Sequence, residues 1–269
     1  MTKPGIDTFR DLGCLVTGAS SGIGREIALL LADEGARIVV TARREDRLEA
    51  LAAELRARGA GEAHVVADDL ADREATLRVV EAAERHLGHV DVLVNNAGFS
   101  VPGPFVRSSL ERTEAMLDVN VVAATGLMRR LLPGMVKRGR GGVLNVASIA
   151  GFMAAPYQAG YAGTKAYLLN LTESAYQEVK HTGVALTALC PGVTDTEFFE
   201  AAGYQNLGKF LDQRMPAAKV ARIGLAGFKR GKRTVVTGFS NKALVVLSGF
   251  LPRGFVGAMA RWVMVGRRT

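Results

Sequence analysis

Short, wholly apolar runs alternate along this chain with longer segments in which apolar residues recur at helical spacing. The short runs do not alternate with polar residues, which is typical of strands buried on both faces of a parallel sheet. The pattern predicts strands over residues 14–17, 37–41, 64–67, 90–94, 142–146, 184–189 and 234–237, and helices over about 22–34, 45–58, 72–87, 110–137 and 157–181. This regular alternation predicts an α/β fold with a doubly wound sheet of about seven mainly parallel strands and helices on both faces.

The same pattern bounds the organisation of the chain. It shows no internal repeat or linker, and 269 residues is a common size for one α/β domain. We predict one domain over residues 1–240 and a helical extension of it over residues 241–269. Residues 1–13 contain no apolar signal-like core, and no uncharged apolar run reaches the roughly 18 residues of a membrane-spanning helix.

Composition adds two limits. With 48% hydrophobic and 22% charged residues, the chain resembles ordinary soluble globular proteins. The two cysteines, Cys14 and Cys190, lie in apolar runs, which favours buried thiols in a reducing cytoplasm. Neither the cysteines nor the four histidines have metal-ligand spacing, so no metal site is predicted.

Charge is distributed unevenly. The net charge is +8, but the last acidic residue is Asp212. The 57 residues after it carry 12 Lys or Arg and no Asp or Glu, whereas residues 1–212 carry 22 basic and 26 acidic residues. This asymmetry indicates an anionic partner for the C-terminal fifth of the chain. The basic residues are mixed with aliphatic ones and form no nucleic-acid-binding motif, so no nucleic-acid partner is predicted.

A glycine-rich segment joins the first predicted strand to the first predicted helix. It reads Thr-Gly-Ala-Ser-Ser-Gly-Ile-Gly over residues 17–24. Glycines at this point permit a tight turn and let a pyrophosphate approach the backbone and the helix N-terminus, as in Rossmann-like folds. The predicted phosphate-binding residues are Gly18, Ser20, Ser21, Gly22, Ile23 and Gly24.

The end of the second predicted strand indicates which dinucleotide binds. An acidic residue there would hold the adenosine ribose of NAD, but this chain reads Thr41-Ala42-Arg43-Arg44. An arginine can instead pair with a 2′-phosphate, so Arg43 favours NADP(H), with NAD(H) as the alternative. The remaining alternative is that both arginines start a helix and face solvent.

Two Tyr-x-x-x-Lys pairs are candidates for acid–base chemistry, Tyr161 with Lys165 and Tyr176 with Lys180. Side chains four apart share a helix face, and an ammonium beside a phenol lowers its pKa from the ordinary value of about 10. The first pair follows Ser148 at the carboxyl end of a predicted strand, where open α/β sheets bind ligands. The second pair lies about 22 Å further along the helix. Tyr161 is therefore the predicted proton donor or acceptor, and Ser148 would hold the reacting oxygen.

Together these motifs resemble the classical short-chain dehydrogenases/reductases (SDR) over roughly residues 10–240. The matching positions are residues 17–24, Asp69-Leu70, Asn95-Asn96-Ala97-Gly98, Asn120, Ser148, Tyr161 with Lys165, and Pro191-Gly192 with Thr196. The resemblance implies an NADPH-dependent oxidoreductase that reduces a ketone to a secondary alcohol. The alternative is a non-catalytic NADP(H)-binding sensor or scaffold on the same fold, although such proteins usually lack a catalytic residue that this chain retains.

The resemblance also implies individual roles in catalysis. Tyr161 would donate the proton and Ser148 would orient the carbonyl oxygen. Lys165 would bind the nicotinamide ribose, and Asn120 would hold a water that relays protons to it. A helix-interior Asn that bonds only the backbone is the alternative for Asn120.

Further residues are implied to contact the cofactor. Asp69, or its neighbour Asp68, would bind the adenine amino group beside Leu70. For Asn95, a structural role and a cofactor contact are equal alternatives. Besides Tyr161 and Lys165, the other implied contacts are Asn96, Ala97, Gly98, Pro191, Gly192, Val193 and Thr196.

Two C-terminal regions bear on the substrate. Residues 194–215 cover the substrate in the family and contain Phe198, Phe199, Tyr204 and Phe210, which can pack on an apolar substrate or on the domain. A helix from Phe255 would place Phe255, Ala258, Met259, Trp262, Val263 and Gly266 on one side. Arg253, Arg261, Arg267 and Arg268 would lie opposite, with Met264 as an exception.

Such a basic amphipathic helix can lie on an anionic membrane, contact an acidic acyl-carrier protein, or bury its apolar side against the core or another subunit. The first two alternatives favour a lipophilic small-molecule carbonyl or alcohol substrate, such as a 3-oxoacyl chain or a ketosteroid. We expect a cytoplasmic protein, peripherally membrane-associated under the first alternative. The family resemblance implies a homodimer or homotetramer.

Overall fold

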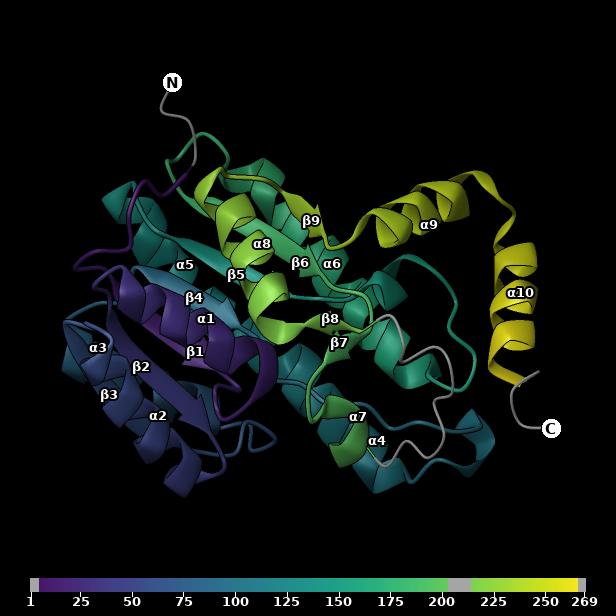
Figure 1. The fold of residues 1–269 in the computed structure, drawn as a ribbon, viewed down its shortest axis with the longest axis horizontal. Helices are drawn as coiled ribbons and strands as arrows, with labels where there is room; N and C mark the ends of the chain where they lie inside the picture. Colours follow the sequence, from purple (N-terminus) through teal and green to yellow (C-terminus); the bar gives the residue numbers. More distant parts are fainter. Residues whose placement is uncertain (1–4, 203–213, 266–269) are drawn as a thin grey trace.

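Seven parallel strands form the central sheet, in the order β3-β2-β1-β4-β5-β6-β9 (Figure 1). They are β1 (Gly13–Thr17), β2 (Arg37–Ala42), β3 (Glu62–Ala67), β4 (Val92–Asn95), β5 (Gly142–Val146), β6 (Ala185–Cys190) and β9 (Thr234–Val236). Two shorter strands, β7 (Thr194–Asp195) and β8 (Met215–Pro216), pair separately. The computed structural model describes residues 5–202 and 214–265. The predicted doubly wound parallel sheet is confirmed.

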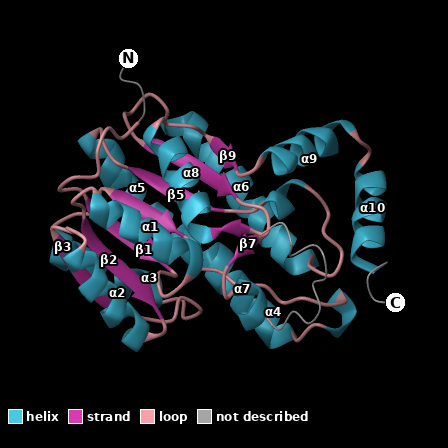
Figure 2. Cartoon of the chain, in the orientation of Figure 1, coloured by secondary structure: helices cyan, strands magenta, loops and turns pink. Residues whose placement is uncertain are grey.

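Helices cover both faces of this sheet (Figure 2). One face is covered by α1 (Gly22–Asp33), α2 (Glu45–Ala57) and α8 (Ala217–Lys229). The other is covered by α3 (Ala75–Leu87), α5 (Ala124–Arg138) and α6 (Ala159–Val179). The inner strands are buried on both sides, which explains why their sequences are mostly apolar, whereas the edge strands β3 and β9 are only partly buried.

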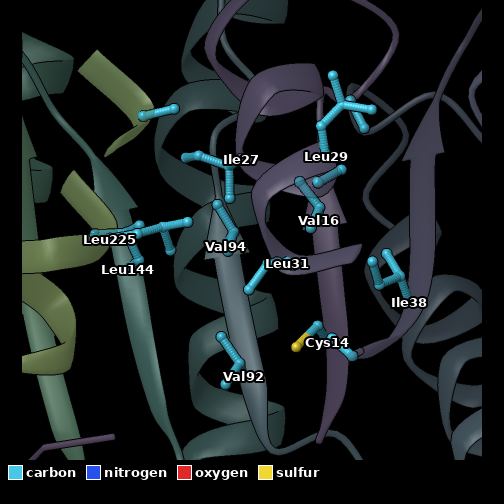
Figure 3. Close-up of a cluster of buried hydrophobic side chains, with 14 of the residues drawn as sticks. Cys14, Val16, Ile27, Leu29, Leu31, Ile38, Val92, Val94, Leu144 and Leu225 are labelled. Carbon is cyan, nitrogen blue, oxygen red and sulfur yellow. The ribbon is translucent and has the colours of Figure 1, made fainter. Parts of the chain in front are cut away.

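Alternate residues of each strand fill the two hydrophobic layers, since successive side chains point to opposite faces. Cys14 and Val16 of β1 pack in the layer under α1, whereas Leu15 between them packs in the other layer. Figure 3 shows the first layer, where Ile27 and Leu31 of α1 lie over the strands. Both cysteines of the chain are buried and free, as predicted, and burial raises the pKa of the Cys190 thiol to about 12.

The helix predicted over residues 110–137 is three consecutive elements. It consists of α4 (Leu110–Leu117), a π-helical turn η2 (Asp118–Ala123) and α5, which ends at Gly139 in a left-handed conformation. The π-turn surrounds Asn120, whose side chain is bonded to the backbone of Phe99 in the loop after β4. A π-turn inserts one extra residue into a helix, which apolar periodicity alone does not reveal.

Strand β4 begins two residues later than predicted, at Val92. The carboxylate of Asp91 turns back and accepts a hydrogen bond from the Gly13 N–H at the start of β1, at 3.1 Å. Asp91 therefore anchors the amino end of the neighbouring strand rather than extending β4.

The topology brings the loops after β1 and β4 together. The chain leaves β1 towards β2 and β3 on one side of the sheet, and later returns to place β4 on the other side. Thr17, the last residue of β1, binds this junction, because its Oγ1 accepts the N–H groups of Asn96 and Ala97 at 3.0 Å each. Ligands of open α/β sheets bind at such a switch point.

The predicted C-terminal extension is present, but it has two helices and begins at residue 239. They are α9 (Phe239–Phe250) and α10 (Arg253–Val265), joined next to Pro252, and they lie at the end of the molecule opposite α2 and α3 (Figure 1). None of the helices in the described ranges combines the length and apolarity needed to cross a membrane. Gly266, Arg267 and Arg268 of the predicted amphipathic helix, and the side chains of Val263 and Met264, lie outside the described residues.

Candidate active site

The four predicted catalytic residues lie at the carboxyl ends of the central strands and are all buried. Ser148 lies two residues beyond β5, Asn120 lies in the π-turn, and Tyr161 and Lys165 lie in the first two turns of α6. Their proximity is visible at Gly98, where an added Cβ would come within 2.9 Å of Asn120 Oδ1 and 3.5 Å of Lys165 Nζ. The fold therefore brings this glycine, Asn120 and Lys165 to one point.

Lys165 is a buried cation. Its Nζ donates a 2.8 Å hydrogen bond to the carbonyl of Val146, two residues before Ser148. Burial lowers the pKa of Lys165 from its ordinary 10.5 to about 8, because the ammonium has lost most of its hydration. A lysine with this pKa changes charge close to physiological pH, which is typical of functional sites.

Tyr161 lies between the lysine and an aromatic cluster. Lys165 Nζ is 5.7 Å from the centroid of the Tyr161 ring. On the other side, the ring of Phe198, from the short helix α7 (Phe198–Ala201), has its centroid 5.4 Å away, and Phe199 packs edge-on against Phe198. Of the four aromatic residues predicted over the substrate, Phe198 therefore contacts Tyr161 and Phe199 packs behind it, while Tyr204 and Phe210 lie outside the described residues.

Ser148 caps the short 3-10 helix η3 (Ile149–Phe152). Its Oγ accepts the N–H of Ala150 at 3.1 Å and donates to the carbonyl of Pro191 at 3.5 Å. A donor distance of 3.5 Å is at the weak limit for an O–H bond. The hydroxyl proton can therefore turn to a substrate oxygen at small cost.

Asn120 is held by its whole side chain. Its Oδ1 accepts the N–H of Phe99 at 3.1 Å, and its amide donates to Phe99 O and to Thr164 Oγ1 at 3.0 and 3.1 Å. Thr164 in turn donates to the carbonyl of Tyr161 at 2.7 Å. Both amide hydrogens of Asn120 are thus donated within the protein. A relay water would therefore have to donate a hydrogen bond to an oxygen of Asn120. No sequence pattern pointed to Thr164.

The glycine-rich loop has the form that a dinucleotide phosphate needs. Gly18 and Gly22 have φ of +62° and +58°, which favour glycine, and an added Cβ at Gly18 would lie 2.7 Å from the Cα of Ala97. At Gly22 it would lie 2.9 Å from Thr196 Cγ2. The Ser21 side chain does not cap α1, and its first turn contains no acid, so the positive helix N-terminus is available to an anion. The residues fit the implied cofactor.

The asparagines at the end of β4, Asn95 within the strand and Asn96 after it, make bonds that hold the fold together. Asn95 is buried and donates to Ala124 O and Asn145 Oδ1, which gives it a structural role. Asn96 donates to the carbonyls of Thr17 and Gly18 at 3.0 Å each, so its side chain fixes the glycine-rich loop to β4. A cofactor contact at Asn96 would therefore come from its backbone.

At the end of β3 the structure separates the two candidate carboxylates. Asp68 accepts two hydrogen bonds from Arg78, at 2.9 and 2.7 Å. Asp69 is exposed, and Leu70 beside it is buried. Asp69 is consequently the better placed of the two to receive an adenine.

The arginines after β2 differ in their contacts. Arg43 is exposed, whereas Arg44 donates to Ser20 Oγ and Ser21 Oγ of the glycine-rich loop at 3.0 and 3.3 Å. Arg44 also pairs with Glu197, which Arg47 contacts as well, and these two arginines lower the pKa of Glu197. The sequence indicated Arg43, and the structure adds Arg44 as a second candidate, since it lies against the glycine-rich loop; no sequence pattern indicated Glu197.

The remaining predicted residues fall into two locations. Pro191, Gly192, Val193 and Thr196 follow β6 beside Ser148 and the glycine-rich loop. The second Tyr-Lys pair lies elsewhere: Tyr176 packs against the hydrophobic layer under α3, and Lys180 donates to Gln177. Of the two lysines, Lys165 is the one whose Nζ bonds β5 close to Ser148, at the carbonyl of Val146.

The sequence is similar to known proteins over most of its length. The family model for short chain dehydrogenase matches residues 13–206. A ketoacyl reductase of Nostoc sp., HetN, is 34% identical over 233 residues, which cover 87% of this chain and 77% of that protein.

Solved structures agree with this match. A short-chain dehydrogenase from Sphingobium yanoikuyae in complex with NADPH has a TM-score of 0.76 and 30% identity, covering 89% of this chain and 95% of that one. A short chain dehydrogenase/reductase from Burkholderia phymatum in complex with NAD has a TM-score of 0.82 and 25% identity, covering 90% and 94%.

Proposed function

The chain belongs to the short-chain dehydrogenase family, and we propose that it is an NADPH-dependent reductase that converts a lipophilic ketone to a secondary alcohol. The observation that carries the proposal is the buried Lys165, whose Nζ lies 5.7 Å from the Tyr161 ring and bonds the carbonyl of Val146, two residues before Ser148. A screen of NADPH oxidation across acyl-chain, steroid and small aromatic ketones tests it.

In the proposed reaction the bound nicotinamide supplies hydride to the carbonyl carbon. Tyr161 donates its phenolic proton to the carbonyl oxygen as negative charge develops there. Ser148 donates a hydrogen bond to the same oxygen and fixes its direction. The positive charge of Lys165 stabilises the phenolate that forms when Tyr161 gives up its proton. Asn120 holds the loop after β4 against α6 through its bonds to Phe99 and Thr164. One of its oxygens accepts a hydrogen bond from the relay water.

The cofactor preference is proposed from the arginines after β2. Arg43 and Arg44 provide two cations at the position where an acid would select NAD, and Arg44 already lies against Ser20 and Ser21. The NADPH-bound Sphingobium relative supports NADP(H), while the NAD-bound Burkholderia relative keeps NAD(H) as the alternative. Asp69 is the proposed adenine contact, because Arg78 engages Asp68.

Replacing Glu197 with Gln is expected to tighten NADPH binding by several fold. The carboxylate now occupies Arg44 and Arg47, and a 2′-phosphate must compete with it for the same guanidinium. Binding of NADH should change by less than twofold, because NADH has no 2′-phosphate. Fluorescence titration with each cofactor measures both values, and weaker NADPH binding in this variant would contradict the assignment of Arg44.

The rate of reduction is expected to fall above pH 8. Lys165 is an ammonium below its pKa of about 8 and loses the charge as pH rises through that value. The value of kcat/KM for NADPH, which reports ionisations of the free enzyme, should be level below pH 8 and fall about tenfold per pH unit above it. The Lys180→Met variant should give the same profile, and a level profile up to pH 10 would contradict the role of Lys165.

A lipophilic substrate is proposed on two grounds. Phe198 places an apolar ring against Tyr161, with Phe199 packed behind it, and one relative is named a ketoacyl reductase. A 3-oxoacyl chain is thus the first substrate class to try and a ketosteroid the second. The substrate would be presented free, from a membrane or on an acyl-carrier protein.

We further propose a cytoplasmic homodimer or homotetramer. The two buried free thiols suit a reducing compartment. Leu117, Val122 and Tyr167 are exposed on α4, the π-turn and α6, which provides an apolar surface for a second subunit. Light scattering of the purified protein measures the assembly directly.

The second candidate function is an NADP(H) sensor or scaffold. It shares the cofactor site and differs only in having no turnover. Binding of NADPH with no consumption of any ketone would favour the sensor. The burial of a cationic lysine beside Tyr161 favours the enzyme, since a protein without chemistry gains nothing from that cost.

A further inference from the structure

Helix α9 presents a continuous apolar stripe to the outside. Phe239, Ala243, Val246, Leu247 and Phe250 recur at helical spacing and are all exposed, Phe239 by 88% and Phe250 by 84%. The opposite side of the helix, with Asn241 and Leu244, is half-buried over η3. The less apolar side of the helix thus packs on the protein, and the large apolar side chains of the other side remain exposed.

Helix α10 is arranged in the same way. Phe255, Met259 and Trp262 lie on one side and are exposed, Trp262 by 76%. The opposite side contacts the protein through Val256, which is only 4% exposed, and through Gly257, where an added Cβ would lie 3.6 Å from the Cβ of Ala154. The apolar side predicted from the sequence is therefore not packed against the core of this chain.

These exposed side chains of two consecutive helices are together called the C-terminal docking face. Its members are Phe239, Val246, Leu247, Phe250, Phe255, Met259 and Trp262. Soluble monomers rarely leave this many large apolar side chains uncovered on adjacent helices, and such a surface usually marks an interaction site.

The charge around the docking face selects the kind of partner. Residues 239–269 contain five Lys or Arg and no Asp or Glu. Lys242, Arg253 and Arg261 are exposed on the same two helices. Aromatic and aliphatic side chains flanked only by cations match the surface of an anionic bilayer, where the rings enter the interface and the cations meet phosphates. Two copies joined face to face would instead oppose like charges.

We propose that the C-terminal docking face binds the surface of an anionic lipid bilayer. Helix α9 follows the carboxyl end of β9 and rests on η3, which begins directly after Ser148. Helix α10 touches Ala154 in the loop after η3. Docking therefore holds the side of the molecule that contains Ser148 next to the membrane. Delivery of a lipophilic ketone from the bilayer is a consequence that rests on the proposed function, whereas docking itself does not.

Trp262 supplies a direct probe, because it is the only Trp of the chain. Vesicles of phosphatidylglycerol, added to the full-length protein, should shift the Trp emission to the blue and sediment the protein. Vesicles of phosphatidylcholine should bind it at least about tenfold more weakly. High salt should release the electrostatic part of the binding.

Variants identify the surface. Phe250→Asp should reduce sedimentation with phosphatidylglycerol about tenfold or more, because it places a charge where an apolar ring is buried. Lys242→Ala and Arg261→Ala should each reduce it about fivefold. The matched control is Leu77→Asp on α3, a residue 37% exposed at the far end of the molecule, which should change nothing. Unaltered NADPH binding shows that each variant is folded.

Four outcomes would overturn the proposal. The first is no response to phosphatidylglycerol, and the second is a loss of binding with Leu77→Asp equal to that with Phe250→Asp. The third is a blue shift without lipid that grows with protein concentration and accompanies a doubled mass. The fourth is a response to an acidic acyl-carrier protein but not to vesicles. Turnover of a short, water-soluble ketone separates the two proposals: vesicle binding without turnover contradicts only the reductase, and turnover without vesicle binding contradicts only the docking.

Discussion

Replacing Tyr161 with Phe is expected to lower the rate of ketone reduction by about 10²- to 10⁴-fold, the usual contribution of a general acid. The substitution removes one hydroxyl and keeps the ring, which packs 5.4 Å from Phe198. Binding of NADPH should stay within about threefold of wild type, because the glycine-rich loop, Arg44 and Lys165 are unchanged. Single-turnover absorbance at 340 nm measures the chemical step, and fluorescence titration measures the binding.

The chain contains its own control for this substitution. Tyr176 begins the second Tyr-x-x-x-Lys pair on the same helix but packs in the hydrophobic layer under α3. Tyr176→Phe should therefore retain nearly full activity. Equal rates for the two variants, both close to wild type, would remove Tyr161 from the mechanism.

Removing the arginines after β2 is expected to produce the second-largest effect. Arg44→Ala should lower kcat/KM with NADPH by roughly 10- to 100-fold, since a hydrogen-bonded charge pair contributes about 1.5–3 kcal/mol. Arg43→Ala should act in the same direction. With NADH, both variants should stay within about threefold of wild type, so the preference for NADPH should shrink or disappear in the double variant.

Steady-state kinetics with both cofactors measures this preference. Arg58→Ala is the matched control, because Arg58 lies at the other end of α2 and pairs with Asp33. It should leave both cofactors unaffected. A wild-type protein that prefers NADH would refute the assignment of both Arg43 and Arg44.

Most of the fold could be predicted because its signals are local. A strand buried on both faces must be apolar at every position, and runs such as residues 14–17 show this directly. Tyr161 and Lys165 are one helical turn apart, and Ser148 precedes them at the end of a predicted strand, so their spacing predicted an acid–base site. The mostly apolar strands and the glycines of the phosphate loop can likewise be recognised from a single sequence.

The features that were missed depend on contacts between distant residues. Arg44 and Glu197 are 153 positions apart, and no local pattern joins them. The π-turn contains Asn120, which is bonded to Phe99, 21 positions away. Apolar periodicity does not reveal the extra residue of such a turn. The amphipathic pattern of the C-terminal segment was correct, but periodicity alone could not show that its apolar side is left uncovered.

The most direct test of the proposed reaction is the transfer of deuterium from NADPH. The protein is mixed with NADPH deuterated at the transferred position of C4 and with a 3-oxoacyl or steroid ketone, and the product is analysed by mass spectrometry and NMR. We expect an alcohol with one deuterium on the former carbonyl carbon, and at most trace amounts of it with Tyr161→Phe. Tight binding of NADPH without deuterium in the product of any ketone would contradict the proposed reduction.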